Sequence, residues 1–187
     1  MMKNLISPHP FHTIAIDYVT KLPTTAEGYT CMLTIIDLHS KWPMAFPVRT
    51  RSAEEAAEII FKHVICRHGT PKRIISDQEG SFGSAVCKNL CKRLGIQKIE
   101  TTGWHPSGNG VLERWHRYLN STITTFLNTK KDNWPGCIEP LLFAYRISVH
   151  DATQLSPFKI LHGREAVLPT DVSLGLDEDS LDKKRQA

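Results

Sequence analysis

The chain has 187 residues, of which 41% are hydrophobic and 22% charged, a balance typical of one globular domain with a substantial core. Its formal net charge of +4 is compatible with a polyanionic partner but does not require one. The longest apolar runs are too short to span a bilayer, and the first residues lack the apolar core of a signal peptide. Five cysteines without repeated spacing indicate a reducing compartment rather than a disulfide framework.

The first part of the chain has the patterns of three β-strands, over residues 12–19, 30–40 and 42–48. The first strand alternates between two faces, and Asp17 shares one face with Ala15 and Val19. The second is mostly apolar on both faces, as expected of a central strand. The third contains Pro43 and Pro47, which favour an edge position, and the short connection before it predicts antiparallel pairing.

After residue 50 the pattern changes to alternating helices and strands. We predict helices over residues 51–69, 84–95, 111–129, 134–150 and 156–163, and strands over 72–77 and 96–102. In the first helix Ser52 is the expected N-cap, Glu55 completes a capping box and Gly69 ends the helix. This order predicts the α/β class, with a ribonuclease-H-like mixed sheet of about five strands flanked by helices.

Three carboxylates in these elements are candidates for a common site. Asp17 lies within the first strand, Asp77 ends the fourth, and Glu113 lies in the first turns of the long helix. The first and fourth strands are expected to be neighbours in the sheet, so the three side chains should converge. Like charges at short range repel, and a divalent cation such as Mg²⁺, which takes oxygen ligands, is the usual remedy. The pattern therefore predicts a metal site.

Simpler interpretations exist for each acid. A single aspartate after a strand, such as Asp77, is more often a turn residue, and Asp37 is best explained by hydrogen bonds to the turn that follows it. Glu113 can equally form a helical ion pair with Arg117, four residues on. Asp17 is the hardest to explain structurally, because a charge is seldom placed inside a strand with apolar neighbours.

Two groups of potential zinc ligands occur in predicted helices, His63–Cys66–His68 and Cys87–Cys91. Neither forms a credible four-ligand site, so we interpret them as helix-face and core residues.

Five segments together resemble the catalytic core of retroviral and LTR-retrotransposon integrases, nearest the gypsy type. They are IAIDYVTKLP, LTIIDLHSKWPMAFPV, HGTPKRIISDQEGSF, WHPSGNGVLERWHRYL and SPFKILHGREAVLP. The resemblance runs from about Phe11 to Pro169, and the interval between Asp77 and Glu113 has the length characteristic of that family.

The resemblance implies a ribonuclease-H-like fold and a catalytic triad of Asp17, Asp77 and Glu113. It implies two Mg²⁺ or Mn²⁺ ions, one held by Asp17 and Asp77 and the other by Asp17 and Glu113. The implied reactions are DNA 3′-end processing and strand transfer, with element ends and target duplex as DNA partners and a homodimer or higher oligomer as the assembly. Candidate DNA contacts are Asn109, His116, Arg117 and Asn120.

This chain departs from the family pattern near the second aspartate, where Glu79 stands in place of the usual glycine. His116, Trp104 and Ser107 also replace commoner residues, but none of these changes removes a metal ligand. We find no zinc module with His/His/Cys/Cys spacing in this chain.

The expected organisation is an N-terminal extension over residues 1–10, the integrase catalytic core over 11–170, and a polar, disordered tail over 171–187. No membrane association is expected. The implied site of action is the nucleus, although no targeting signal is evident beyond a weakly basic C-terminus, and the cytoplasm is the other expected compartment.

Two other functions compete with the integrase-type transferase. One is a catalytically silent, integrase-derived module for nucleic-acid binding or oligomerisation, which Glu79 favours and the intact triad disfavours. The other is a ribonuclease-H-like nuclease of a different kind, which the HPSGNGVLER and SPFKILHGR segments disfavour.

Overall fold

The computed structural model of the chain describes residues 7–20, 22–77, 82, 84–101, 117–118 and 133–175. In these ranges no helix has both the length and the apolar character needed to cross a membrane.

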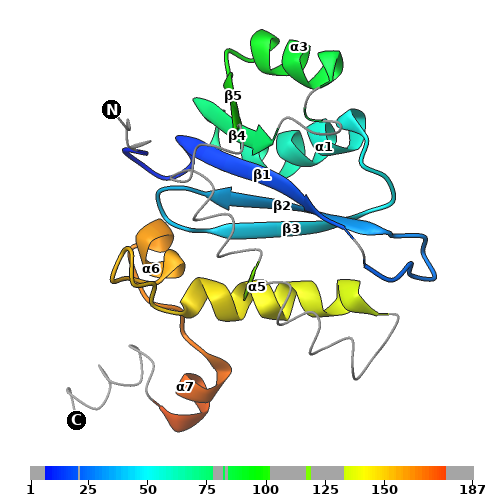
Figure 1. Cartoon of the computed structure of the whole chain (residues 1–187). Helices are drawn as coiled ribbons and strands as arrows, with labels where there is room; N and C mark the ends of the chain where they lie inside the picture. The colour runs from blue at the N-terminus through cyan, green and yellow to red at the C-terminus, as the bar shows by residue number, and fades with distance from the viewer. Residues whose placement is uncertain are drawn as a thin grey trace.

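A mixed sheet in the order β3-β2-β1-β4-β5 forms the centre of the described part of the chain (Figure 1). Its strands are β1 (Thr13–Val19), β2 (Cys31–Asp37), β3 (Pro43–Val48), β4 (Arg73–Asp77) and β5 (Gln97–Thr101). β1, β2 and β3 pair antiparallel, whereas β4 runs parallel to both β1 and β5. The predicted five-stranded mixed sheet is confirmed, including the central position of β2, the edge position of β3 and the pairing of the first and fourth strands.

The helices flank this sheet on both faces. The first helix consists of α1 (Ala53–Ile59), the π-helical η1 (Ile60–Ile65) and α2 (Cys66–His68), and α3 (Ala85–Arg93) follows β4. Later in the chain are the 3₁₀ turn η3 (Trp134–Cys137), α5 (Ile138–Ile147), α6 (Pro157–His162) and α7 (Pro169–Leu174). In Figure 1, α1 and α3 lie on one side of the sheet and α5 lies on the other. No helix was predicted at α7, which crosses the boundary expected at residue 170.

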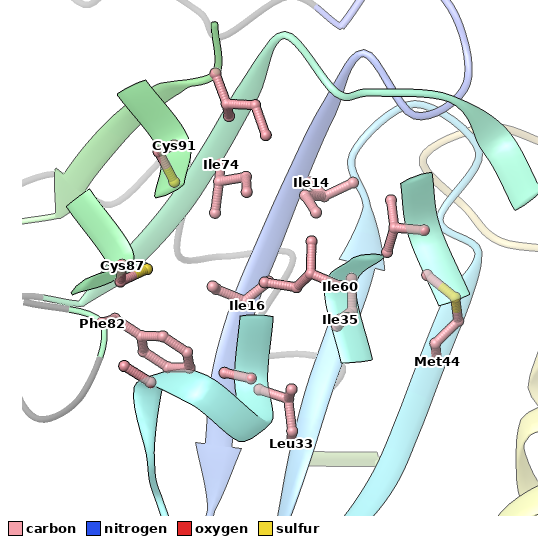
Figure 2. Close-up of a cluster of buried hydrophobic side chains, with 14 of the residues drawn as sticks. Ile14, Ile16, Leu33, Ile35, Met44, Ile60, Ile74, Phe82, Cys87 and Cys91 are labelled. Carbon is pink, nitrogen blue, oxygen red and sulfur yellow. The ribbon is translucent and has the colours of Figure 1, made fainter. Parts of the chain in front are cut away.

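Alternation along β1 divides the interior into two hydrophobic clusters, one on each face of the sheet. Ile14 and Ile16 belong to the cluster that α1, η1 and α3 complete, part of which is drawn in Figure 2. Ala15 and Val19 belong to the second cluster, which η3 and α5 complete and in which Trp134 is fully buried. Burial of each such side chain stabilises the fold by about 1.5–3 kcal/mol, so β1 is held firmly from both sides.

The start of the first helix confirms half of the predicted capping box. The Ser52 hydroxyl accepts a hydrogen bond from the backbone N–H of Glu55 at 3.0 Å, as an N-cap should. The second half of the prediction was wrong, because the Glu55 carboxylate accepts from the backbone N–H groups of Arg49 and Thr50. The Glu55 carboxylate therefore stabilises the connection between β3 and the first helix.

Candidate metal and nucleic-acid site

Asp17 and Asp77 lie on neighbouring parallel strands. The parallel register of β1 and β4 pairs Thr13 with Arg73 and Ala15 with Ile75, and this last pair lies two residues before each acid. Adjacent strands are about 4.8 Å apart. The structure thus makes the strands that carry two of the three predicted acids neighbours in the sheet, although these acids are far apart in sequence.

The carboxylate of Asp17 is half-buried on the face of the sheet that carries the second hydrophobic cluster. Its Oδ1 accepts a hydrogen bond from the backbone N–H of Tyr18 at 2.7 Å. Its backbone carbonyl accepts from the Thr34 hydroxyl on β2 at 2.9 Å. Burial raises the pKa of Asp17, and the Tyr18 hydrogen bond opposes this only in part. A carboxylate in this environment gains from a nearby cation, which stabilises its ionised form.

An aromatic contact joins the Asp17 strand to the segment that follows Asp77. The rings of Tyr18 and Phe82 are stacked with centroids 4.8 Å apart, and the Tyr18 hydroxyl donates to the backbone carbonyl of Ser52 at 3.3 Å. Phe82 is 1% exposed, and Figure 2 shows it within the first hydrophobic cluster, beside Cys87. Sequence analysis did not single out Phe82. The signal in the sequence that could have identified Phe82 was a large aromatic residue five positions after Asp77, the acid that ends a strand.

The remaining predicted site residues are only partly covered by the structure. Glu113, Asn109, His116 and Asn120 lie outside the described residues, and of Asp77 only the backbone is described. Arg117 is helical and exposed, and its neighbour Tyr118 packs edge-on against Tyr145 of α5, with ring centroids 5.1 Å apart. This contact puts the backbone that carries Arg117 beside α5.

Asp37 has the structural role predicted for it. It is fully buried, and its Oδ2 accepts from both the backbone N–H and the hydroxyl of Ser40, at 2.8 and 2.6 Å. Its Oδ1 accepts from the backbone N–H of Phe11 at 2.9 Å. These bonds hold the β2–β3 turn and the start of β1, and they distinguish Asp37 from Asp17.

The donors at the Asp17 position suit a hard divalent cation. Carboxylate oxygens are the ligands that Mg²⁺ and Mn²⁺ prefer, and the neighbouring parallel strands β1 and β4 each carry one aspartate two residues beyond their last paired residue. Within the described ranges no group of three or more His, Cys, Asp or Glu side chains forms a metal site. The third predicted ligand, Glu113, falls outside those ranges.

The cysteines of the second predicted group lie in the protein core. Cys87 and Cys91 are both buried in the first hydrophobic cluster, where Figure 2 labels them on α3. Of the first group, His63 packs against Phe46 and His68 stacks on Phe11, while Cys66 is exposed.

The sequence matches the family model described as the integrase core domain over residues 7–106. It is 29% identical over 161 residues to the retrovirus-related Pol polyprotein from transposon 412 of Drosophila melanogaster, covering 86% of this chain and 13% of that protein. It is 27% identical over 157 residues to the transposon Tf2-3 polyprotein of Schizosaccharomyces pombe, covering 83% of this chain and 12% of the other. The chain therefore spans roughly an eighth of the length of these relatives.

Two solved structures share the fold. The HTLV-2 integrase catalytic core domain in complex with magnesium, in a trimeric form, superimposes with a TM-score of 0.66 at 17% identity, over 84% of this chain and 100% of that one. The catalytic core domain of BIV integrase gives a TM-score of 0.65 at 21% identity, over 82% and 95% of the two chains. At this identity the likeness establishes the ribonuclease-H-like fold.

Proposed function

The chain belongs to the integrase core domain family, and on this premise we propose that it is the catalytic core of a metal-dependent polynucleotidyl transferase. The proposed reactions are 3′-end processing of DNA and transfer of the processed strand into a target duplex. In the first, water attacks a phosphodiester bond; in the second, a DNA 3′-hydroxyl does so. The family assignment supports an enzyme of the integrase type, and the specific reactions belong to the proposal.

The observation that carries the proposal is the register of β1 and β4. It makes the strands that carry Asp17 and Asp77 parallel neighbours, and Asp17 is a half-buried acid whose pKa burial raises. Asp37, the other acid in these first strands, is already saturated with hydrogen bonds. A half-buried carboxylate at the meeting point of two strands is costly for folding alone and useful for holding a cation.

In the proposed site Asp17 and Asp77 hold one divalent cation, and Asp17 and Glu113 hold the other. When bound, the two ions would neutralise charge on the attacking and leaving oxygens of the phosphodiester. The protein's own contribution is positioning: β1 and β4 fix the two aspartates, and the Tyr18 N–H orients the Asp17 carboxylate. Arg117, which is exposed on its helix, is a proposed contact to the phosphate backbone, and Asn109, His116 and Asn120 are further proposed DNA contacts.

The test is cleavage and joining on a branched DNA substrate by the full chain, with Mg²⁺ or Mn²⁺ added. Asp77→Asn and Asp17→Asn should each lose all products while DNA binding is retained. Glu58→Gln is the matched control, because Glu58 is exposed on α1 and pairs only with Lys62 at the surface. Activity that survives in either aspartate variant would refute the proposed site.

The second candidate function is the catalytically silent module for nucleic-acid binding or oligomerisation, which the glutamate at position 79 favours. An additional carboxylate beside the metal ligands would repel the DNA phosphates. Folded protein that binds DNA but gives no product with either metal would support this reading. Glu79→Gly is then the variant expected to restore activity, if the repulsion is the cause.

The proposed partners are DNA element ends, target duplex and further copies of the chain, and the proposed site of action is the nucleus. Solved relatives support an assembly, because the HTLV-2 core domain is described in both dimeric and trimeric forms.

A further inference from the structure

A cavity of about 280 Å³ lies at the β3 edge of the sheet, between the first helix, α5 and α6. In the strand order β3-β2-β1-β4-β5, this edge is two strands away from Asp17. The volume is close to the lower limit of about 300 Å³ for pockets that hold small ligands. The cavity is therefore a separate feature from the proposed metal site.

Three histidines line this cavity, and their ring nitrogens have no hydrogen-bond partner in the part of the chain that the structure describes. His63 packs against the ring of Phe46, at 4.4 Å between centroids. His68 stacks on Phe11, and His162 contacts the rings of Trp42 and Phe158. Imidazole nitrogens normally hydrogen-bond, so three of them around one cavity supply donors for a ligand.

The charges around the cavity are predominantly positive. Arg67 lies on its rim, exposed and without an ion pair or hydrogen bond to any described residue. Glu139 is 3.6 Å from Arg146, and Arg146 also donates two hydrogen bonds to the backbone carbonyl of Pro43. The one acid in the lining is thus already neutralised, and Arg67 remains available to an anion.

The rest of the lining is apolar and partly aromatic. Trp42 and Phe46 contribute rings, and Met44, Leu142 and Leu161 contribute aliphatic surface. Flat aromatic ligands fit such walls, because rings stack and bury large apolar areas.

We propose that this cavity binds a small aromatic acid, with its ring between Trp42 and Phe46 and its carboxylate directed to Arg67 and the histidines. Arginine and carboxylate form strong charge-assisted hydrogen bonds, and the cavity has room for one or two fused rings.

The histidines make binding depend on pH. His63 faces Arg67 and Lys62 on its own helix and Glu139 on α5, while His68 faces Arg67, Asp37 and His162. Burial lowers the pKa of both histidines from 6.5, and the neighbouring cations lower it further. A bound carboxylate raises the pKa of His63 and His68 again, so binding takes up protons and becomes tighter as the pH falls.

The experiment is calorimetric titration of the full chain with naphthalene-2-carboxylate, alongside ¹H–¹³C NMR of the histidine rings. Naphthalene-2-carboxamide and acetate serve as comparison probes, because the first lacks the charge and the second lacks the ring. The acid should bind, shift the His63, His68 and His162 signals and bind more tightly at lower pH. Arg67→Gln should weaken binding about tenfold or more, whereas Arg93→Gln, an exposed arginine on α3, should leave it unchanged.

Several outcomes would overturn the proposal. Equal binding of the acid and its amide would remove the role of charge, and binding that is unchanged in Arg67→Gln would place the ligand elsewhere. Sedimentation measured in parallel tests whether a second copy of the chain, the main alternative to the small acid, occupies this face. Failure of the acid to bind, together with dimers that Arg67→Glu disrupts, would assign this face to that second copy instead.

Discussion

The ring of Tyr18 stacks on the ring of Phe82, with centroids 4.8 Å apart and planes 13° from parallel. Tyr18 follows Asp17 on β1, and Phe82 lies five positions after Asp77. The stack therefore joins the backbone regions of two proposed metal ligands through the first hydrophobic cluster, not through the acids themselves.

This stack should couple stability to activity. Tyr18→Leu and Phe82→Leu are each expected to lower the free energy of unfolding, and the double variant should show a coupling of about 0.5–1.5 kcal/mol beyond simple loss of area. Denaturant unfolding of the four proteins measures it. Phe82→Leu should also reduce cleavage of branched DNA, because the segment after Asp77 loses its anchor.

Phe61→Leu is the control for this double-mutant comparison, since Phe61 is 53% exposed on η1. Its substitution should change neither the free energy of unfolding nor DNA cleavage appreciably. A coupling near zero would mean that Tyr18 and Phe82 are held independently.

Asp17→Asn should stabilise the protein while abolishing activity. Burial raises the folded-state pKa of Asp17 above 3.8, so the folded protein holds this proton more tightly than the unfolded chain. The contribution of this proton to the free energy of unfolding is fully present at pH values below the unfolded-state pKa of Asp17. It is lost as the pH rises through the folded-state pKa. Asparagine cannot ionise and keeps an acceptor for the Tyr18 N–H, so without divalent cations its Tm near neutral pH should be about 2–4 °C higher.

Adding Mg²⁺ or Mn²⁺ should reverse this order, because a cation that binds only the folded protein raises its Tm by mass action. Wild-type protein should gain stability with metal, and Asp17→Asn should not. Identical metal responses in thermal unfolding would argue against a cation at Asp17, whatever the activity assay gives.

Most of the sheet could be predicted because its information is local. The two-residue alternation around Asp17, the apolar run of β2 and the prolines of β3 each specify a strand and its place. The pairing of β1 with β4 is not local, and it was expected from the ribonuclease-H-like layout that the order of elements suggested.

Features that depend on contacts between distant segments could not be predicted. The π-helical turn η1 differs from an α-helix in its backbone hydrogen bonds, and a stretch of six residues is too short for apolar spacing to distinguish the two. The Glu55 carboxylate had several backbone N–H groups in reach, and only the path of the chain after β3 selects those of Arg49 and Thr50. The Tyr18–Phe82 stack likewise joins elements that no periodicity relates.

Substitution of Asp37 should lower stability and leave activity intact, the opposite of the effects expected for Asp17. Asp37→Ala leaves three donors from Phe11 and Ser40 without their acceptor in a fully buried position, at a cost of about 2–4 kcal/mol. Activity per folded molecule should be retained, because the side chain serves the β2–β3 turn. Denaturant unfolding and DNA cleavage at a temperature where the variant is folded test the two halves separately. Loss of activity in fully folded Asp37→Ala would give this residue a role beyond structure.

Cysteine reactivity should distinguish one thiol from four. Cys66 is exposed on α2, whereas Cys31, Cys87, Cys91 and Cys137 are buried. Native protein should therefore react rapidly with Ellman's reagent at one site and denatured protein at five, and Cys66→Ser should remove the rapid phase. Rapid reaction of Cys87 or Cys91 in native protein would show that α3 opens readily, since both thiols are on the buried face of that helix.

Arg146 protects the exposed edge of the sheet, and its removal should promote association. Its guanidinium lies over the Trp42 ring at 4.5 Å and donates from Nε and Nη2 to the backbone carbonyl of Pro43, at 3.3 and 2.9 Å. Edge strands with unpaired carbonyls pair readily with other chains, and the two prolines of β3 and this arginine each oppose such pairing.

Arg146→Met keeps much of the apolar stem but loses the two hydrogen bonds and the cation–π contact. It should lower the free energy of unfolding by about 2–3 kcal/mol and increase light scattering on mild heating. Arg146→Lys should recover the charge but not the paired hydrogen bonds. Its free energy of unfolding should therefore lie between those of the wild type and Arg146→Met. If Arg146→Met is as stable and as soluble as the wild type, β3 is protected by Pro43 and Pro47 alone, and the arginine serves only the neighbouring cavity.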